Sequence, residues 1–321
     1  MKAVLGIDQA KKKFDAALLR NGKYKTKVFE NNPAGFSALL AWLAQNDVET
    51  VHACMEATST YGEALARFLH EADHSVSVTN PARIKAFGQS ELLRTKNDKT
   101  DAKLIARYCE TMKPTLWQPA PAEIEYLRGL GRRRDALVRM RTQELNRQEN
   151  SNEIVSTSIQ TVLECLDKEI EQISKLIKDH ISKHPDLKRK HDLLNSIPGV
   201  GPATIEAILS EINAFEGFET VEKVVAYMGL SPKEHTSGSS VKGKSAICKI
   251  GNARLRKALY MPALSAMLYN PVVKALYDRM KAKSKNGMVI ACACMKKLVH
   301  LIYGVIKSNK PFDPAYTLKT A

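Results

Sequence analysis

Short apolar runs of strand length open the chain and predict the first part of a β-sheet. They cover residues 3–7, 14–19 and 24–29. The dipeptide Asn21-Gly22 separates the second run from the third, and it is the strongest short-range signal for a β-hairpin. We therefore expect three consecutive strands joined by tight turns.

Strands and helices alternate after this opening. Apolar residues at helical spacing follow Pro33, a residue suited to the first turn of a helix. Three hairpin strands followed by such alternation predict an α/β fold of the RNase H-like kind. The actin and sugar-kinase fold also begins with a Gly-Ile-Asp strand, but it continues with phosphate-admitting glycines where this chain has Gln9-Ala10-Lys11. The later elements are expected at 51–55, 61–71, 75–79 and from Pro81.

The pattern changes after Trp117-Gln-Pro-Ala-Pro121, whose two prolines break any helix. One long arginine-rich helix is predicted from Glu123 to Asn150. Six apolar residues then step by 4, 3, 4, 3 and 4, which is the heptad seam of a coiled coil. The seam fits either a hairpin with the preceding helix or a contact between two copies of the chain. The six residues are Ile159, Leu163, Leu166, Ile170, Ile173 and Ile177.

The last third of the chain is predicted to be mainly helical. Its segment Ile197-Pro-Gly-Val-Gly-Pro202 is similar to the second half of a helix-hairpin-helix, in which glycines permit the turn and backbone N–H groups accept a phosphate. A tight turn between two helices without a ligand explains the same residues equally well. The chain thus divides into predicted parts at 1–118, 119–190 and 191–321.

Four acidic residues carry the strongest chemical signal. Asp8 and Glu56 each end an apolar strand, and Asp98 and Asp101 lie three residues apart at the start of a predicted helix. Converging carboxylates repel one another unless a cation lies between them. Mg²⁺ prefers oxygen ligands, and paired Mg²⁺ ions serve phosphodiester chemistry. Any one of these acids could simply cap a helix, but four together predict a metal site.

Positive charge is concentrated in the C-terminal part. Residues 233–310 hold 16 Lys and Arg against Glu234 and Asp278, which is most of the formal net charge of +15. This predicts a polyphosphate partner, although a basic surface without a ligand is the alternative. The arginines of the long helix could likewise follow a nucleic-acid backbone or pair with acids of their own helix. The predicted nucleic-acid contacts are Arg128, Arg132, Arg133, Arg134, Arg139, Lys242, Lys244, Arg254 and Arg256.

The overall composition is that of a soluble protein, with 44% hydrophobic and 26% charged residues. No apolar stretch approaches the ~20 residues that span a bilayer, and an acid follows the first apolar run too early for a signal peptide. The six cysteines lack paired zinc-site spacing. We therefore expect a cytoplasmic protein with reduced cysteines and no membrane partner, associated with the bacterial nucleoid while it reacts.

The loop from Ser231 to Ser245 is rich in serine, glycine and lysine. It can be interpreted as a flexible linker, as a phosphate-binding turn, or as the carrier of a serine nucleophile. A nucleophile needs an activating group, and the loop itself holds no triad partner. The acidic quartet, through a metal ion, could supply this activation. Chemistry alone does not separate Ser237 from Ser239 or Ser240.

These motifs, in this order, resemble the one-hundred-and-ten family of insertion-sequence transposases along essentially the whole chain. Residues 1–110 look like the RuvC-like DEDD domain of that family, and the C-terminal part is similar to its transposase domain. The N-terminal segments are Gly6-Ile7-Asp8, Met55-Glu56-Ala57-Thr58-Ser59-Thr60-Tyr61, Asn80-Pro81 and Asp98-x-x-Asp101-Ala102. The C-terminal segments are Ser196-Ile-Pro-Gly-Val-Gly, Gly229-Leu-Ser-Pro, Ser237-Gly-Ser-Ser-Val-Lys-Gly, Lys249-Ile-Gly-Asn and Leu255-Arg-Lys-Ala-Leu-Tyr-Met-Pro-Ala.

The resemblance implies a DNA recombinase that a structured bridge RNA guides to donor and target DNA. It implies that Asp8, Glu56, Asp98 and Asp101 bind Mg²⁺, and that Ser237 is the nucleophile that forms a phosphoserine. It also implies dimers that pair into a tetramer, in which the acids of one subunit meet the serine of another. The alternatives are a RuvC-like nuclease or Holliday-junction resolvase that acts by hydrolysis, and a non-catalytic nucleic-acid-binding protein.

Overall fold

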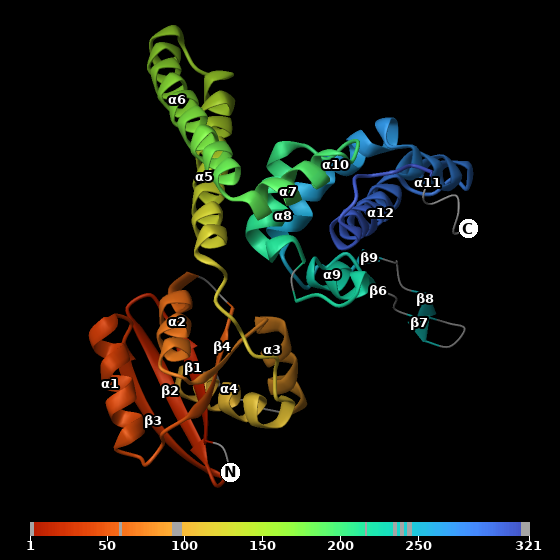
Figure 1. Cartoon of the computed structure of the whole chain (residues 1–321). Coiled ribbons are helices and arrows are strands. Elements are labelled where there is room, and N and C mark those ends of the chain that lie inside the picture. Colours follow the sequence, from red (N-terminus) through yellow and green to blue (C-terminus); the bar gives the residue numbers. More distant parts are fainter. Residues whose placement is uncertain are drawn as a thin grey trace. The chain divides into compact units, whose positions relative to one another are not determined.

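The chain forms two compact units, residues 1–119 and 120–321. The predicted middle part, 119–190, therefore lies almost wholly within the second unit. Figure 1 shows the elements of both units in a computed structural model. The structure describes residues 3–57, 60–91, 98–215, 217–233, 236–237, 241–242 and 246–315, with only the backbone described at 60, 236–237 and 241–242.

The first unit is a five-stranded mixed sheet in the order β3-β2-β1-β4-β5. Strands β1, β2 and β3 are antiparallel neighbours, whereas β4 and β5 run parallel to β1. This is the strand order of the predicted RNase H-like sheet. The elements are β1 (Ala3–Gln9), β2 (Lys13–Arg20), β3 (Lys23–Glu30), α1 (Pro33–Ala44), β4 (Val51–Glu56), η1 (Thr60–Gly62), α2 (Glu63–Glu71), β5 (Ser75–Thr79), α3 (Pro81–Ser90) and α4 (Asp98–Met112).

Helices cover both faces of this sheet, because its central strands β1 and β2 carry buried, mostly apolar side chains on both faces. On one face Leu5, Ile7 and Met55 pack against α1 and α2 in one core cluster. On the other face Val4 and Cys54 pack against α3 and α4 in a second cluster. The mixed α/β architecture predicted for the N-terminal part is therefore confirmed.

The second unit is mostly helical and packs around one apolar core. This agrees with the predicted mainly helical C-terminal part. Four two-residue strands form two small ladders between α9 and α10, namely β6 (Pro232–Lys233), β7 (Thr236–Ser237), β8 (Val241–Lys242) and β9 (Ala246–Ile247). The helices are α5 (Ala122–Gln148), α6 (Glu153–Lys183), α7 (Pro185–Asn195), α8 (Pro202–Ile212), η2 (Asn213–Phe215), α9 (Val221–Tyr227), α10 (Ala253–Tyr269), α11 (Pro271–Ala282) and α12 (Gly287–Ser308).

The heptad seam lies on α6, which forms a helical hairpin with α5 (Figure 1). Ile159, Leu163 and Leu166 are buried, as is Ile177 at the base of the hairpin. The seam thus packs against α5 of the same chain, which is the hairpin that the spacing allowed as one of two interpretations. A seam at this spacing buries one face of a helix whichever partner covers it. Whether α6 also contacts a second copy stays a prediction.

A glycine turn joins α7 to α8, where the helix-hairpin-helix was predicted. Gly199 has φ +93°, and a Cβ there would lie 2.8 Å from the backbone of Ala266 in α10. Asn270 donates from its amide to the carbonyl of Pro198 at 3.3 Å. The glycine is thus required by a close contact with α10, which is a structural role. A phosphate-binding role for this turn stays a prediction.

Helix α12 is the exception to the expectation that no apolar stretch approaches membrane-spanning length. Among the residues that the structure describes, it alone is long and apolar enough to cross a bilayer by length and composition. Residues on one of its faces, including Cys294, Leu298 and Ile302, are fully buried in the core of the second unit. Its apolar character is therefore used for packing in this structure.

Candidate active site

Asp8 and Glu56 lie at the same edge of the sheet, at the ends of adjacent parallel strands. Ile7 is in register with Met55, so the residue after each is a neighbour across the ladder. Since side chains alternate between faces, and Ile7 and Met55 face α1, Asp8 and Glu56 belong to the face that α4 covers. Both acids are half-buried.

Gly6 brings the other two acids to this edge. A Cβ at Gly6 would lie 2.1 Å from the carbonyl oxygen of Ala102 and 2.3 Å from the nitrogen of Ala106, so α4 can lie directly on β1 only because residue 6 has no side chain. Asp98 and Asp101 belong to the first turn of α4, where the helix dipole favours carboxylates. The first turn of α4 thus meets the carboxyl end of β1.

A fifth acid, Asp15, belongs to the same site, and the sequence interpretation missed it. It lies directly opposite Asp8 in the antiparallel register of β1 and β2, and it is buried. The ammonium of Lys13 lies 3.1 Å from Asp98 Oδ2 and 3.6 Å from Asp15 Oδ2. The signal was the short link between the strands, which fixes the register and places Asp15 across from Asp8.

The pKa of Asp8 reflects both its burial and the acids around it. Burial, followed by the charges of Asp101, Glu56, Asp98 and Asp15, raises the pKa of Asp8 from its ordinary 3.8 to about 6. Mutual repulsion of this kind is what a bound cation relieves.

A hard divalent cation fits the chemistry of this donor set. Every donor in the set is a carboxylate oxygen, the ligand that Mg²⁺ prefers, and the ammonium of Lys13 already places one positive charge among them. Within the described part of the chain, no three His, Cys, Asp or Glu side chains are arranged closely enough to enclose an ion. Binding would therefore require the carboxylates to draw together.

The predicted nucleophile lies in the second unit, in a loop whose backbone is partly described. Ser237 is in β7, and its backbone pairs with Val241 of β8. At the two ends of the same loop, β6 pairs with β9, and this pairing holds the ends together. The side chains of Ser237 and Lys242, and the whole of Ser239, Ser240 and Lys244, lie outside the described residues.

Five of the predicted nucleic-acid contacts bind groups of the chain itself. Arg128 donates to the carbonyl of Ser210 at 2.9 Å, and Arg256 donates to that of Met228 at 2.9 Å. The other three, Arg132, Arg134 and Arg254, form ion pairs with acids of α5 and α8.

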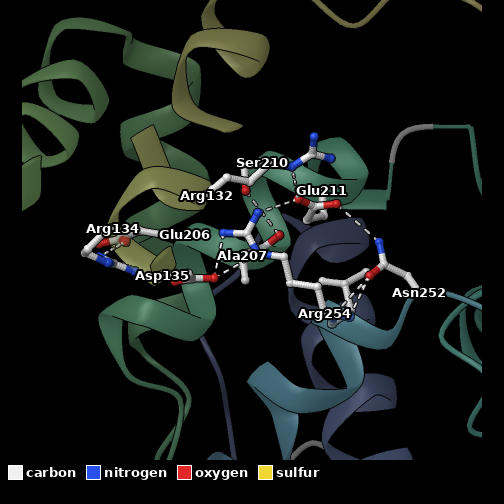
Figure 2. Close-up of polar contacts among 10 residues, drawn as sticks. Arg132, Arg134, Asp135, Glu206, Ala207, Ser210, Glu211, Asn252 and Arg254 are labelled. Carbon is white, nitrogen blue, oxygen red and sulfur yellow. Dashed lines mark hydrogen bonds and ion pairs between the residues drawn. The ribbon is translucent and has the colours of Figure 1, made fainter. Parts of the chain in front are cut away.

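Figure 2 shows the ion-pair cluster, with Arg254 lying between Asp135 and Glu211. These contacts join α5, α8 and α10, which explains why the predicted middle part packs with the C-terminal part. The sequence predicts such ion pairs only with acids of the same helix. The acids of α8 could not be recognised from the sequence, because they lie 72 and 79 residues away from their arginine partners.

Arg133 and Arg139 of α5 are exposed. They keep their charge toward solvent and are the members of the predicted set best placed to meet a phosphate backbone. A nucleic-acid role for any residue of the set stays a prediction.

The fold and the acidic edge define a class: an RNase H-like domain with a carboxylate cluster, followed by a basic helical domain. Comparison with known families agrees. A family model for the DEDD transposase domain of IS110 matches residues 5–151, and one described as Transposase IS116/IS110/IS902 family matches residues 191–278.

The chain is similar to whole proteins of known name. It is 35% identical to a pilin gene-inverting protein of Moraxella bovis over 97% of this chain and 98% of that protein. It is 24% identical to the transposase for insertion sequence element IS1328 of Yersinia enterocolitica, over 78% of this chain and 82% of that protein. The chain belongs to the IS110 family of transposases. It is therefore an enzyme of the transposase and site-specific recombinase class.

A solved structure also aligns with part of the chain. It is RuvC of T. thermophilus in complex with a Holliday junction substrate, 16% identical, covering 36% of this chain and 100% of that chain with a TM-score of 0.28. The fold assignment above rests on the strand order of this chain.

Proposed function

We propose that this enzyme is an RNA-guided DNA recombinase that cleaves and rejoins donor and target DNA through a phosphoserine at Ser237. The observation that carries the proposal is the acidic edge, where the first turn of α4, with Asp98 and Asp101, lies at the ends of the strands that carry Asp8 and Glu56. Burial, with the charges of the neighbouring carboxylates, raises the pKa of Asp8 to about 6. Membership in the transposase family supports DNA as the substrate. A relative named a pilin gene-inverting protein supports the rearrangement of DNA as the outcome.

The acids would hold Mg²⁺. The proposed ligands are Asp8, Glu56, Asp98 and Asp101. Asp15 lies directly opposite Asp8 on the neighbouring strand β2. A bound divalent cation lowers the pKa of a hydroxyl beside it and neutralises charge on a scissile phosphate. In the hydrolytic alternative the same acids would serve a water molecule instead of a serine.

The covalent step conserves the energy of the phosphodiester. The Oγ–P bond forms as the serine loses its proton to water, and the bond from phosphorus to the leaving DNA oxygen breaks as that oxygen takes up a proton. The hydroxyl oxygen of a second strand then attacks the phosphorus and loses its proton to water, and the Oγ–P bond breaks as the serine oxygen takes up a proton. The intermediate allows the strands to be rejoined without added energy, whereas a hydrolysed phosphodiester cannot be rejoined in this way.

The proposed partners are donor DNA, target DNA and a structured bridge RNA that pairs with both. The charge of residues 233–310 supports a nucleic-acid partner. If the RNA recognises the DNA sequence by base pairing, the protein needs only to bind the nucleic-acid backbones. A chain with exposed basic residues and few aromatic ones is suited to that role. We propose that the active form consists of dimers that pair into a tetramer, so that acids and serine come from different subunits. The reaction is expected in the cytoplasm, at the nucleoid.

The test begins with the RNA that copurifies with the protein. This RNA, the protein and Mg²⁺ are incubated with donor and target plasmids, and recombinant junctions are sequenced. Wild type should give joined products, whereas Ser237→Ala should give neither joined products nor a protein–DNA adduct. If Ser237→Ala still cuts DNA at the wild-type rate, the enzyme is a hydrolytic nuclease and the proposal is wrong.

A mixing experiment tests the division of the site between subunits. Asp8→Asn and Ser237→Ala are each expected to be inactive alone. Mixed and allowed to exchange subunits, they should recover part of the activity, because some sites then combine intact acids with an intact serine. No recovery in mixtures that demonstrably exchange subunits would contradict a shared site.

A further inference from the structure

Glu211 of α8 is a buried acid that receives hydrogen bonds from two other helices. Its side chain is 8% exposed. Arg132 of α5 lies 3.3 Å from Oε1, and Arg254 of α10 lies 2.7 Å from the same oxygen. The amide of Asn252 donates to Oε2 at 3.3 Å. Figure 2 shows these three side chains converging on the one carboxylate.

The charge of Glu211 is held by these partners. Burial acts to raise the pKa of Glu211, but the guanidinium groups of Arg132 and Arg254, with the amide of Asn252, outweigh it and hold the pKa below its ordinary value. An ionised buried carboxylate of this kind is costly to leave unpaired, and so are its cationic partners. The carboxylate therefore fixes the positions of the groups around it.

Asn252 connects Glu211 to the first turn of α10. It is the N-cap of that helix, and its Oδ1 accepts from the backbone N–H groups of Arg254 at 3.0 Å and Leu255 at 3.1 Å. The backbone N–H of Asn252 donates to the carbonyl of Tyr227 at 2.8 Å. One side chain thus joins Glu211 to the point where the serine loop ends and α10 begins.

The two ends of the serine loop are held together at this same point. Gly251 has φ +147°, and a Cβ there would lie 2.1 Å from the carbonyl oxygen of Tyr227. The segment between β9 and α10 is thus packed closely against the end of α9. Three hydrogen bonds to backbone carbonyls complete the base of the loop. The N–H of Cys248 donates to the carbonyl of Ser231 at 2.9 Å, and the N–H of Lys249 donates to that of Gly229 at 3.1 Å. The guanidinium of Arg256 donates to the carbonyl of Met228 at 2.9 Å.

We propose that Glu211 is a positioning residue for the serine loop, acting through Asn252 and Arg254 on the base from which Ser237 projects. This inference rests on the proposed function, in which Ser237 attacks DNA. Attack on the phosphate requires the serine hydroxyl to lie within about 0.5 Å of its productive position. The loop between β6 and β9 is joined to the rest of the unit through this base.

The chain contains a matched control for this role. Glu206 lies five residues earlier on α8, its side chain is also 8% exposed, and it forms an ion pair with Arg134 of α5. Among the contacts of the described residues, Glu206 binds α5 and not the base of the loop. Glu211→Gln and Glu206→Gln therefore remove the same charge from the same helix, and only Glu211→Gln acts on Asn252.

The experiment compares the two variants in the full-length protein. Amide hydrogen exchange is measured on peptides that span 246–252, and adduct formation is measured at saturating DNA together with the DNA concentration for half saturation. Glu211→Gln should raise exchange at the loop base about tenfold and slow adduct formation at least ~10-fold. The half-saturating DNA concentration should change less than about twofold, because the exposed basic residues are untouched. Glu206→Gln should match wild type in all three.

Equal exchange at 246–252 in the two variants would overturn the inference, and so would faster exchange with an unchanged adduct rate. If Glu211→Gln does not fold, Asn252→Ser replaces it. Serine is an equally good N-cap but is too short to reach Glu211, and the same changes are expected. Adduct formation that persists in Ser237→Ala would refute the proposed function instead, whatever the exchange at the loop base.

Discussion

Replacing Asp8 by Asn should stabilise the metal-free first unit above about pH 6, although it removes a proposed catalytic group. The pKa of Asp8 is raised from 3.8 to about 6 by burial and by the carboxylates around it. Because the folded-state pKa lies above the unfolded one, the stability that protonated Asp8 provides is fully present below about pH 4. It is lost as the pH rises through about 6.

The magnitude follows from the size of the shift. One pKa unit corresponds to about 1.4 kcal/mol, so a shift of about two units corresponds to at most ~3 kcal/mol. Asp8 is only half-buried, and solvent screens part of the interaction, which reduces the expected effect to about 1–2 kcal/mol. Asparagine is close to aspartate in shape and carries no charge, so Asp8→Asn should gain this amount near pH 8 and nothing near pH 4.

The assay is urea unfolding followed by tryptophan fluorescence in the presence of a chelator. The chain has two tryptophans, and both Trp42 and Trp117 pack in the core of the first unit, so the signal reports that unit alone. Glu49→Gln, an exposed acid of the same unit, is the control and should show no gain. A pH-independent difference between Asp8→Asn and wild type, or a loss of stability near pH 8, would refute the reasoning. Adding Mg²⁺ should stabilise wild type more than the variant.

Two further substitutions follow from the same geometry. Lys13→Met removes the ammonium among the acids, so Mg²⁺ should bind roughly three- to tenfold tighter by calorimetry. Lys12→Met, in the turn just before β2, is the control, and equal affinities of the two variants would contradict the role given to Lys13. Gly199→Ala places a methyl group 2.8 Å from the backbone of Ala266 and requires φ +93° of a residue with a side chain. It should cost about 2–4 kcal/mol by circular dichroism, whereas Gly201→Ala, at φ −96° with open space, should cost less than about 1 kcal/mol.

The acidic edge was predictable because it follows from strand periodicity. Alternation places Asp8 and Glu56 on one face, and parallel pairing places both at one edge. The role of Gly6 and the position of Asp15 were not recognised. The first depends on which helix packs over β1, and the second depends on the register of a hairpin that the sequence only suggests.

The arginine-rich helix was predicted, but the placement of its side chains was not. Arg132 and Arg134 pair with Glu211 and Glu206, which lie 79 and 72 residues further along the chain. Charge pattern within one helix carries no information about such partners. The same holds for the heptad seam. Its spacing predicts which face of α6 is buried but not which helix covers that face, and in the structure this helix is α5.

The central claim is that DNA becomes joined to Ser237 with the help of the N-terminal acids, and mapping the adduct tests it most directly. A reaction stalled on a substrate that cannot complete strand exchange is digested with protease, and the DNA-linked peptide is identified by mass spectrometry. The account predicts a nucleotide on the peptide that contains Ser237, present with Mg²⁺ in wild type and missing in Asp8→Asn. A nucleotide attached to another residue, or cleaved DNA with no attached peptide, would contradict it.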